Sequence, residues 1–341
     1  MTTQSIEAFV AALPKAELHV HLVGSASVPT VLELARRHPE NGVPTDEATL
    51  RSFYEFTDFA HFIEVYIAVN SLVREPEDVE ALIVGVAAEL AAQQVRYAEL
   101  TVTPDSHLLM GIGPTDVADA LTAARETARV AHGVELAWIF DIPGELGLES
   151  GERTIDWVER HAPTGSVGFG LGGPEVGIGR PQFTDVFARA RALGLRSDPH
   201  AGETTGPQTV WDAVRDLRAD RIGHGIAAAQ DPELVDHLVR HEIPLEVCPT
   251  SNVCTRAVAD LAEHPFPALR DAGVAVTLNS DDPGMFSTTL NREYAVAHEA
   301  WGLDAAALAD LARDSVRLSW APEELKRQVL AEIDAVAVAV R

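Results

Sequence analysis

Eight short apolar runs rich in β-forming residues alternate along this chain with longer runs of helical period, and this alternation restricts its fold more than any other feature. The runs predicted to be strands lie at 17–22, 95–101, 135–141, 166–171, 195–200, 221–223, 244–248 and 275–279. Several of the helical runs begin at a proline or at a serine, threonine or aspartate cap. Strands that alternate with helices in this way predict a parallel sheet, because parallel neighbours need a long crossover connection.

We expect the eight strands to close into a TIM-type (β/α)8 barrel, and the alternative is an open, doubly wound sheet. The dinucleotide-binding form of the open sheet carries GxGxxG after its first strand, and no such motif follows 17–22. Polar residues recur where the predicted strands end, which is where barrel enzymes have their active sites. The run at 47–73 predicts a helical insertion after the first strand, and runs at 293–302, 304–315 and 322–340 predict additional C-terminal helices.

Length and composition narrow the class of protein further. The 341 residues suit one barrel, so we expect 1–341 to form a single domain, although two ordinary domains would also fit. The 52 acidic and 26 basic residues give a net charge of −26, which disfavours nucleic acid and anionic lipid as partners. Two cysteines (Cys248 and Cys254) are too few for a disulfide framework, and there is no secretory signal or membrane span, so we expect a cytoplasmic protein.

Histidines end the first and fifth predicted strands. In LHVHL at 18–22, His19 and His21 share one face because side chains alternate along a strand, and two imidazoles about 7 Å apart can hold one metal ion. The fifth strand ends at His200, and Glu203 follows in a glycine-containing turn. A carboxyl group in a closed pocket can keep a proton near neutral pH and donate it. Each motif alone also has an ordinary explanation, such as core histidines or a glutamate at a helix start.

Two further polar motifs end the sixth and eighth predicted strands. His224 lies between two glycines, which let another group approach the backbone closely. Asp281 and Asp282 are adjacent carboxylates, whose repulsion a nearby cation would remove, with Asp281 as the natural ligand. A strand histidine and a solvated turn before Pro283 are the ordinary alternatives. In a barrel the ends of all four strands meet at one mouth. A shared site there therefore explains the four motifs better than four unrelated structural roles.

Together these motifs resemble the adenosine deaminase family of the amidohydrolase superfamily, in order and spacing over nearly the whole chain. The matching segments are LHVHL with Gly24, GGPE (172–175), HAGE (200–203), GHG (223–225), CPTSN (248–252) and SDD (280–282). The resemblance implies one zinc ion per chain, held by His19, His21, His200 and Asp281. It also implies that Glu203 protonates purine N1, that His224 holds and deprotonates the attacking water, that Asp282 meets N7 and that the Gly173 backbone N–H meets N3.

The implied reaction is hydrolytic deamination of a small-molecule aminopurine nucleoside to the 6-oxopurine and ammonia. Purine C6 is a poor electrophile until N1 is protonated, and zinc lowers the pKa of water so that hydroxide is available at neutral pH. The other zinc deaminase class carries an H-x-E and P-C-x-x-C signature. The chain lacks that signature, because Cys248 precedes its proline and Cys254 lies too far along.

One position departs from the pattern of adenosine deaminases. HLVGS at 21–25 has Val23 where they usually have an aspartate that meets the ribose 5′-hydroxyl. An unpaired hydroxyl there would cost about 1–3 kcal/mol. HLVGS and GLGGPE (170–175) resemble the actinobacterial 6-amino-6-deoxyfutalosine deaminases of menaquinone biosynthesis, whose substrate bears a ketone-linked benzoate in place of that hydroxyl.

We therefore expect deamination of aminodeoxyfutalosine to futalosine. The alternatives are deamination of adenosine or another 5′-modified adenosine in purine salvage, with adenine itself less favoured, and a barrel that binds without catalysis. The aromatic residues at 53–62 could cover the benzoate ring or belong to the core. Because the chain is strongly acidic, an anionic substrate also predicts a basic group at the mouth, with Arg153, Arg180 and Arg256 as candidates.

Overall fold

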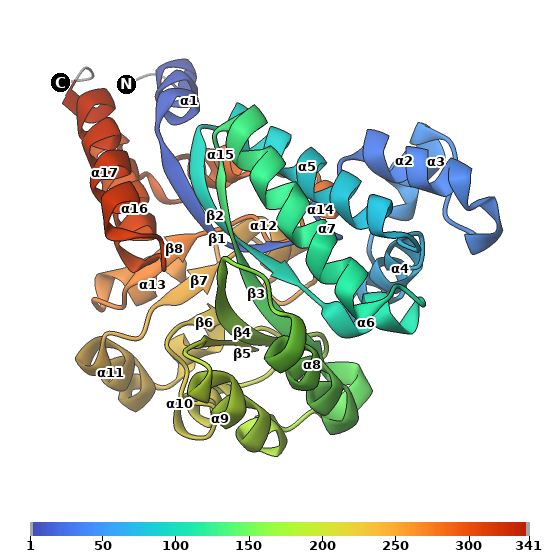
Figure 1. Ribbon diagram of the computed structural model, residues 1–341. Coiled ribbons are helices and arrows are strands. Elements are labelled where there is room, and N and C mark those ends of the chain that lie inside the picture. Colours follow the sequence, from blue (N-terminus) through green and yellow to red (C-terminus); the bar gives the residue numbers. More distant parts are fainter. Residues whose placement is uncertain (1–2, 339–341) are drawn as a thin grey trace.

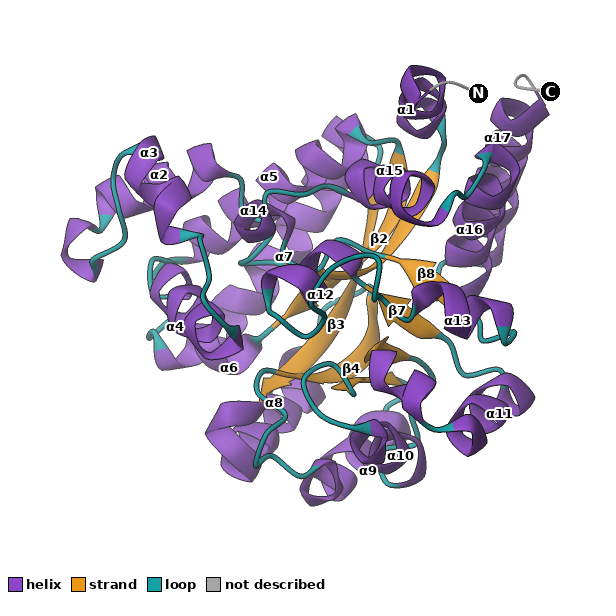
Figure 2. Cartoon of the chain, turned by 180° about the vertical axis from the view of Figure 1, so that it is seen from behind, coloured by secondary structure: helices purple, strands orange, loops and turns teal. Residues whose placement is uncertain are grey.

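The computed structural model of the protein describes residues 3–338, and its eight strands are all parallel (Figure 1). The strands pair in chain order: β1 (Lys15–His21), β2 (Val95–Val102), β3 (Glu135–Pro143), β4 (Ser166–Gly172), β5 (Arg196–Ala201), β6 (Ile222–His224), β7 (Leu245–Val247) and β8 (Val276–Leu278). Each predicted run overlaps one of these strands. In the view from behind, the strands lie at the centre with helices around them (Figure 2), which confirms the barrel expected from the sequence.

The barrel is closed between its first strand and the segment that follows its last. Val20 pairs with Asp281 in a parallel bridge. The backbone N–H of Asp281 donates to the carbonyl of His19 (3.1 Å), and the N–H of His21 donates to the carbonyl of Asp281 (2.9 Å). This closure excludes the open, doubly wound sheet.

Helices cover the outside of the barrel, and most of them begin at a proline or a polar cap, where the first N–H groups need no intrahelical partner. They are α1 (Thr3–Ala12), α2 (Val28–Arg37), α3 (Glu47–Phe53), α4 (Phe59–Asn70), α5 (Pro76–Ala92), α6 (Pro104–Leu109), α7 (Pro114–Thr127), α8 (Gly147–His161), α9 (Thr184–Ala192), α10 (Pro207–Arg215), α11 (Pro232–His241), α12 (Pro249–Cys254), α13 (Phe266–Asp271), α14 (Pro283–Phe286), α15 (Leu290–Trp301), α16 (Ala305–Leu318) and α17 (Glu323–Val338). Within residues 3–338, none of these helices has the length and apolar character that crossing a membrane requires.

The helical insertion expected over 47–73 is confirmed, and it consists of the two helices α3 and α4. The chain leaves the helical path after α3, and the side chain of Asp58 starts α4 by accepting the backbone N–H of His61 (2.9 Å). The helices α2, α3 and α4 lie together on one side of the barrel (Figure 1). The three C-terminal helices are also present, and the last two residues of the expected run 322–340 lie outside the described residues.

All seven residues of β1 are buried, because parallel strands in a barrel are covered on both faces. Alternation turns Ala16, Leu18 and Val20 to one face of the strand and the polar residues to the other. The polar series is Lys15, Glu17, His19 and His21. The interior of the barrel along β1 therefore carries ionisable groups, with the two histidines at the end where the strand reaches the mouth.

Candidate active site

Three histidines and one aspartate from strands far apart in the sequence meet at the mouth of the barrel. His19 and His21 come from β1, His200 from β5, and Asp281 from the turn after β8. One ligand atom from each of these four buried residues lies within 4.8 Å of every other. The Nε2 atoms of His21 and His200 are 3.1 Å apart, and Asp281 Oδ1 lies 3.3 Å from His21 Nε2 and 3.5 Å from His19 Nε2.

The donor set fits a divalent metal ion. His19 Nδ1 is bonded to Glu246 Oε2 (3.0 Å), whereas His19 Nε2 is buried without a hydrogen-bond partner and faces the other ligand atoms. Burial lowers the pKa of His21 to about 4 and also lowers the pKa of His200 well below its ordinary value. Burial acts to lower the pKa of His19, but its bonds to Asp281 and Glu246 raise that pKa well above the ordinary value, so His19 would lose a proton on binding a metal. Imidazoles with a free ring nitrogen, together with one carboxylate, are the ligands that zinc and similar metals bind. The four residues that the sequence nominated are thus together in one place.

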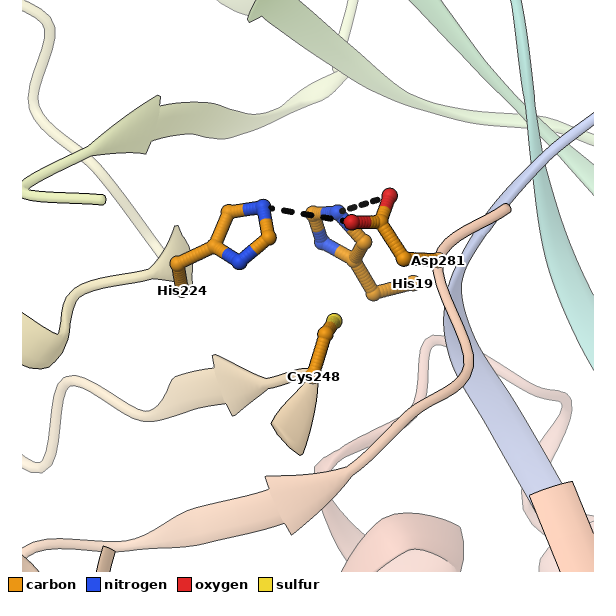
Figure 3. Close-up of side chains that lie close together, drawn as sticks. All are labelled: His19, His224, Cys248 and Asp281. Atoms are coloured by element: carbon orange, nitrogen blue, oxygen red, sulfur yellow. Dashed lines mark ion pairs between the residues drawn. The ribbon is translucent and has the colours of Figure 1, made fainter. Parts of the chain in front are cut away.

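Cys248 lies in the same region and was not foreseen as part of it. Its sulfur belongs to a second close group with His19, His224 and Asp281 (Figure 3). Burial raises the pKa of the Cys248 thiol well above its ordinary value, so the thiol stays protonated and is a poor ligand. The signal for its position was its place at the end of the seventh predicted strand.

A second buried group of charges, the Arg221 cluster, lies inside the barrel beneath the histidines. It consists of Arg221, Glu99, Asp198 and Glu246. The guanidinium contacts Glu99, lies 3.0 Å from Asp198 Oδ2 and 2.7 Å from Glu246 Oε1, and stacks on the ring of Trp320 at 3.5 Å from its centroid. The second oxygen of Glu246 is the one that holds His19 Nδ1, so Glu246 joins the cluster to the mouth and fixes which nitrogen of His19 stays free.

Glu203 is buried beside the four ligand residues. Burial raises its pKa well above the ordinary value, and the charge of Asp281 adds to this effect. The hydroxyl of Thr255 donates to Glu203 Oε1 (3.3 Å). A carboxyl group in this environment carries a proton near neutral pH and can donate it to a substrate.

The turn that carries Glu203 is held by another buried carboxylate, Glu175, from the loop after β4. Glu175 accepts the backbone N–H groups of Gly202 (3.0 Å) and Glu203 (2.9 Å) and the hydroxyls of Thr205 and Thr209. The sequence singled out GGPE as a motif but gave Glu175 no role. Its contacts show that it connects the loop of Gly173 to the turn of Glu203.

His224 also lies beside Glu203 and Asp281 at the mouth of the barrel. Its Nε2 atom lies 3.7 Å from both Glu203 Oε2 and Asp281 Oδ2, and its Nδ1 atom lies 3.1 Å from the side-chain nitrogen of Asn252. Figure 3 shows the ring turned toward Asp281. Burial lowers the pKa of His224 to about 3, so the ring is neutral.

Asp282 and Gly173 complete the set of nominated residues, and both line one cavity with His21, His200 and Glu203. Burial, and then the charge of Asp281, raises the pKa of Asp282 well above its ordinary value, and its Oδ1 atom has no hydrogen-bond partner. The side chain of Asp282 fills the space that a Cβ at residue 24 would occupy, which explains the glycine there. Gly173 has a φ of +77°, a conformation that favours glycine.

The empty space among the lining residues is about 710 Å³, and part of it is open to solvent. Helix α4 forms much of its outer wall through Phe59, Phe62, Ile63, Tyr66, Ile67 and Asn70. Phe62 also packs on Phe286 (ring centroids 5.0 Å apart), while Tyr54 and Phe56 are buried in the core. The aromatic segment is therefore divided, since its later residues line the cavity and its earlier ones belong to the core.

The expected basic group is not among the residues that line this cavity in the described part of the chain. Arg180 is buried, and it donates to the carbonyls of His200 and Ile178. Arg153 forms two hydrogen bonds with Asp105 (2.7 and 2.8 Å). Arg256 is exposed and lines a neighbouring hollow that shares Phe59, Glu203 and Thr255 with the cavity. The expectation is thus wrong for Arg180 and Arg153, because ionic and backbone partners nearby already use their guanidinium groups.

Val23 is buried in the core cluster next to the mouth, and it is not among the residues that line the cavity. Because valine stands where adenosine deaminases usually have an aspartate, this chain lacks a carboxylate at the margin of the site.

Comparison with known proteins agrees with this geometry. The family model described as adenosine deaminase matches residues 14–336. A curated aminodeoxyfutalosine deaminase from Streptomyces avermitilis is 57% identical over 340 residues, which cover 99% of this chain and 95% of the relative.

Two solved structures also superpose closely. An adenine deaminase from Arthrobacter aurescens has a TM-score of 0.90 at 31% identity, with 95% of this chain and 99% of that chain covered. An amidohydrolase from Burkholderia ambifaria, solved with bound zinc, has a TM-score of 0.90 at 25% identity, with 98% of this chain and 94% of that chain covered. The family match and the zinc-bound neighbour both support a metal at the His/Asp group.

Proposed function

The chain belongs to the adenosine deaminase family, and from that premise we propose that it is a zinc-dependent hydrolase that converts 6-amino-6-deoxyfutalosine and water to futalosine and ammonia. The reaction would belong to menaquinone biosynthesis. The observation that carries the proposal is the convergence of four metal-type ligands with Glu203, a buried carboxyl group of raised pKa, at one barrel mouth. The 57% identity to an aminodeoxyfutalosine deaminase supports the choice of substrate.

His19, His21, His200 and Asp281 would hold the zinc ion. The bound metal would act as a Lewis acid that makes water a nucleophile at neutral pH. The chain contributes the geometry, since Glu246 fixes His19 with its Nε2 toward the site and Asp281 is fixed by its backbone pairing with β1. Burial of all four side chains excludes bulk water from this region.

Three further groups would read the edge of the purine. Glu203 would donate its proton to N1 and make C6 electrophilic, and Asp282, protonated as its raised pKa indicates, would donate to N7. The backbone N–H of Gly173 would donate to N3. These contacts would orient the base with N1 toward Glu203 and with N9, which carries the ribose, on the opposite side of the ring.

This orientation decides where the 5′ extension goes. Helix α4 begins at Phe59, which borders the same hollow as Glu203, and ends at Asn70, about 16 Å further along the helix axis. A ribose that points away from Glu203 would direct its extension toward the Asn70 end of α4. Ser106, from the short helix α6, lines the same cavity. The benzoate ring would contact Ile63 and Ile67, and its carboxylate would accept hydrogen bonds from Asn70 and Ser106. Arg256 lies at the other end.

A substrate panel tests the proposal. Purified, zinc-loaded protein is assayed with aminodeoxyfutalosine, adenosine, adenine and 5′-methylthioadenosine, by ammonia release and by conversion of the adenine spectrum to that of hypoxanthine. We expect the highest kcat/KM for aminodeoxyfutalosine. A large preference for adenosine or adenine would overturn the substrate assignment and leave the deaminase chemistry in place. Failure to deaminate any aminopurine would overturn both.

Variants of the outer wall sharpen this test. Asn70→Ala and Ser106→Ala should each raise KM for aminodeoxyfutalosine, by about fivefold if one hydrogen bond of about 1 kcal/mol is lost, and leave KM for adenosine unchanged. Arg256→Gln is the matched control, because we place the benzoate at the opposite end of α4. An Arg256→Gln variant that selectively loses the benzoate-bearing substrate would overturn this orientation.

Adenine deamination is the second candidate, and the specific observation in its favour is the close superposition on an adenine deaminase. The extent of the α4 wall counts against it, since free adenine would leave the lining residues beyond Phe62 without a partner. The same panel separates the two candidates.

A further inference from the structure

The order of the strands around the barrel decides which strand ends face each edge of a bound purine. Glu203 follows β5, Gly173 follows β4, and Asp282 follows β8, which closes on β1. The path around the mouth from Glu203 past Gly173 to Asp282 therefore crosses the ends of β3, β2 and β1. Because β1 ends in the metal-type ligands His19 and His21, the positions left for other contacts on this path are the ends of β3 and β2.

The atoms of a purine follow the same order. Around its edge N1 is followed by N3, then by N9, and then by N7. With N1 at Glu203, N3 at Gly173 and N7 at Asp282, as proposed above, N9 and the ribose that it carries would face the ends of β3 and β2. The side chains at these two strand ends are therefore the ones that a ribose would meet.

A buried carboxylate lies near the end of β3 and lines the cavity. Asp141 is 4% exposed, and it belongs to the same cavity wall as Gly173. The hydroxyl of Thr103, the first residue after β2, donates to Asp141 Oδ1 (2.6 Å). The other oxygen, Oδ2, lies beside Gly172, since a Cβ added to that glycine would be 2.8 Å from it. Thr103 thus holds one oxygen of Asp141 and leaves the other next to the loop that carries Gly173.

A second carboxylate lies at the rim of the same wall. Glu145 follows β3, is exposed and lines the cavity. Its Oε2 atom would be 2.5 Å from a Cβ on Gly173, so this carboxylate lies directly against the glycine. Among the described residues no lysine or arginine lines the cavity to pair with either carboxylate. Two adjacent acceptors in this place suit a ligand that offers two neighbouring donors, which a ribose does.

We propose that Asp141 and Glu145 bind the ribose of the substrate by accepting hydrogen bonds from its 2′- and 3′-hydroxyls. The 2′-carbon is bonded to the carbon that carries the base, so the 2′-hydroxyl lies deeper and meets the buried Asp141. The 3′-hydroxyl lies one carbon further out and meets Glu145 at the rim. A carboxylate accepts a ribose hydroxyl of NAD in the same way in dinucleotide-binding folds. The inference deepens the proposed function and rests on it for the orientation of the base.

This assignment moves recognition of the sugar away from its 5′ position. Val23 cannot accept a hydrogen bond from a 5′-hydroxyl, whereas the 2′,3′-diol is common to adenosine, 5′-methylthioadenosine and aminodeoxyfutalosine. The 5′ substituent can then differ from a hydroxyl without loss of the contacts that hold the ribose. Free adenine has neither hydroxyl, and a 2′-deoxynucleoside lacks the one that Asp141 would bind.

Removal of one hydroxyl and of one side chain, singly and together, tests the deeper contact. We would measure kcat/KM for aminodeoxyfutalosine and its 2′-deoxy analogue with zinc-loaded wild type and Asp141→Ala. We expect the wild type to prefer the ribonucleoside by about 10–100-fold, as for a hydrogen bond to a charged group, and Asp141→Ala to lose this preference. Asp119→Asn is the matched control, because Asp119 is an exposed carboxylate on α7, and it should keep the preference.

The outcomes separate this inference from the proposed function. A wild type that deaminates both compounds equally well, or an Asp141→Ala variant that keeps the wild-type preference, would overturn the role of Asp141 and leave the deaminase assignment in place. A wild type that deaminates neither compound would overturn both.

Variants at Thr103 test the same contact without a change in the carboxylate, and they serve also if Asp141→Ala does not fold. Thr103→Val keeps the shape of the side chain but cannot donate to Asp141, whereas Thr103→Ser keeps the hydroxyl. We expect the preference for the ribonucleoside to fall severalfold in Thr103→Val and to persist in Thr103→Ser. Equal, wild-type preferences in the two variants would contradict the role given to this hydroxyl.

The 3′-deoxy analogue tests the rim in the same way. Glu145 is exposed, so water competes for its hydrogen bonds, and the preference for the 3′-hydroxyl should be smaller than that for the 2′-hydroxyl. Glu145→Ala should abolish it and leave the discrimination against the 2′-deoxy analogue unchanged. Loss of 2′ discrimination in Glu145→Ala with none in Asp141→Ala would overturn the assignment of each hydroxyl to its carboxylate.

Discussion

The mouth of the barrel and the Arg221 cluster beneath it are both buried groups of ionisable side chains, and they differ in the source of their positive charge. The Arg221 cluster surrounds a fixed guanidinium with Glu99, Asp198 and Glu246. The mouth brings together Glu203, Asp281 and Asp282, and in the described chain no lysine or arginine lines it. A buried carboxylate is stable only when it is paired or protonated. The lower cluster therefore contains its cation as folded, although burial raises the pKa of Glu99 and raises the pKa of Asp198 to about 7, so it also retains protons. The mouth retains protons as well, but its cation must be added.

Glu246 belongs to both regions, since one oxygen faces Arg221 and the other holds His19. The Arg221 cluster and the mouth are therefore two different kinds of buried charged group that are in direct contact. One kind should control stability and the other activity, and the following experiments test that division.

Removal of the metal should have the largest effect, and only on the mouth. Chelation is expected to reduce deamination to background, and added zinc should restore it. The Arg221 cluster needs no metal, so the far-UV circular dichroism of the apoprotein should match that of the loaded protein, with a lower melting temperature. Zinc at about 1,000 times its dissociation constant would add about 4 kcal/mol of stability. Full activity in rigorously metal-free protein would contradict this division.

Glu203→Gln should lower kcat by about 10²–10⁴-fold, because the amide cannot transfer a proton to N1. The same substitution removes a buried carboxyl group, so the free energy of unfolding should not fall. Steady-state kinetics and chemical denaturation measure the two quantities. A loss of kcat below about tenfold would mean that another group supplies the proton.

Arg221→Met should act in the opposite way, through stability. It leaves three buried carboxylates without their cation and should cost about 3–5 kcal/mol of the free energy of unfolding. Arg189→Met is the matched control, because Arg189 pairs with Glu152, Asp156 and Glu159 on the surface and should contribute no more than about 1 kcal/mol. Equal effects of the two substitutions in denaturation would remove the distinction between the clusters.

Val23→Asp should have the smallest effect. An aspartate at the margin of the mouth could accept a ribose 5′-hydroxyl, so kcat/KM for adenosine should rise about fivefold relative to aminodeoxyfutalosine. The expected gain is small because residue 23 lies in the core beside the cavity. An unchanged ratio between the two substrates would show that position 23 does not select them.

The sequence predicts the parts of this molecule that follow from local pattern. Alternation of strands and helices predicts the barrel, and a barrel brings strand ends together, so His19, His200, His224 and Asp281 could be expected at one mouth. The partners of these residues could not be predicted in the same way. Glu246 of β7 contacts His19 of β1, and nothing near position 246 in the chain signals that contact.

Residues that act at a distance were missed for the same reason. Glu175 lies in a loop, and its role depends on hydrogen bonds to the turn of Glu203. For Arg180 the sequence suggested a role that the structure does not support. Its position in a loop after a strand had suggested a contact with the substrate. Its guanidinium is instead buried against backbone carbonyls, which hydropathy does not reveal.

The closure of the barrel has a consequence for how the site comes into being during synthesis. The hydrogen bond from Leu18 to Asn279 joins residues 261 positions apart, and the pairing of β1 with Asp281 lies beside it. Contacts this distant in sequence close late, since the loop between them must first be ordered. A nascent chain on the ribosome displays His19 and His21 long before Asp281 has been made. Until then it can offer only an incomplete, more exposed set of ligands, so we expect full metal affinity to arise only once the last strand has joined the first.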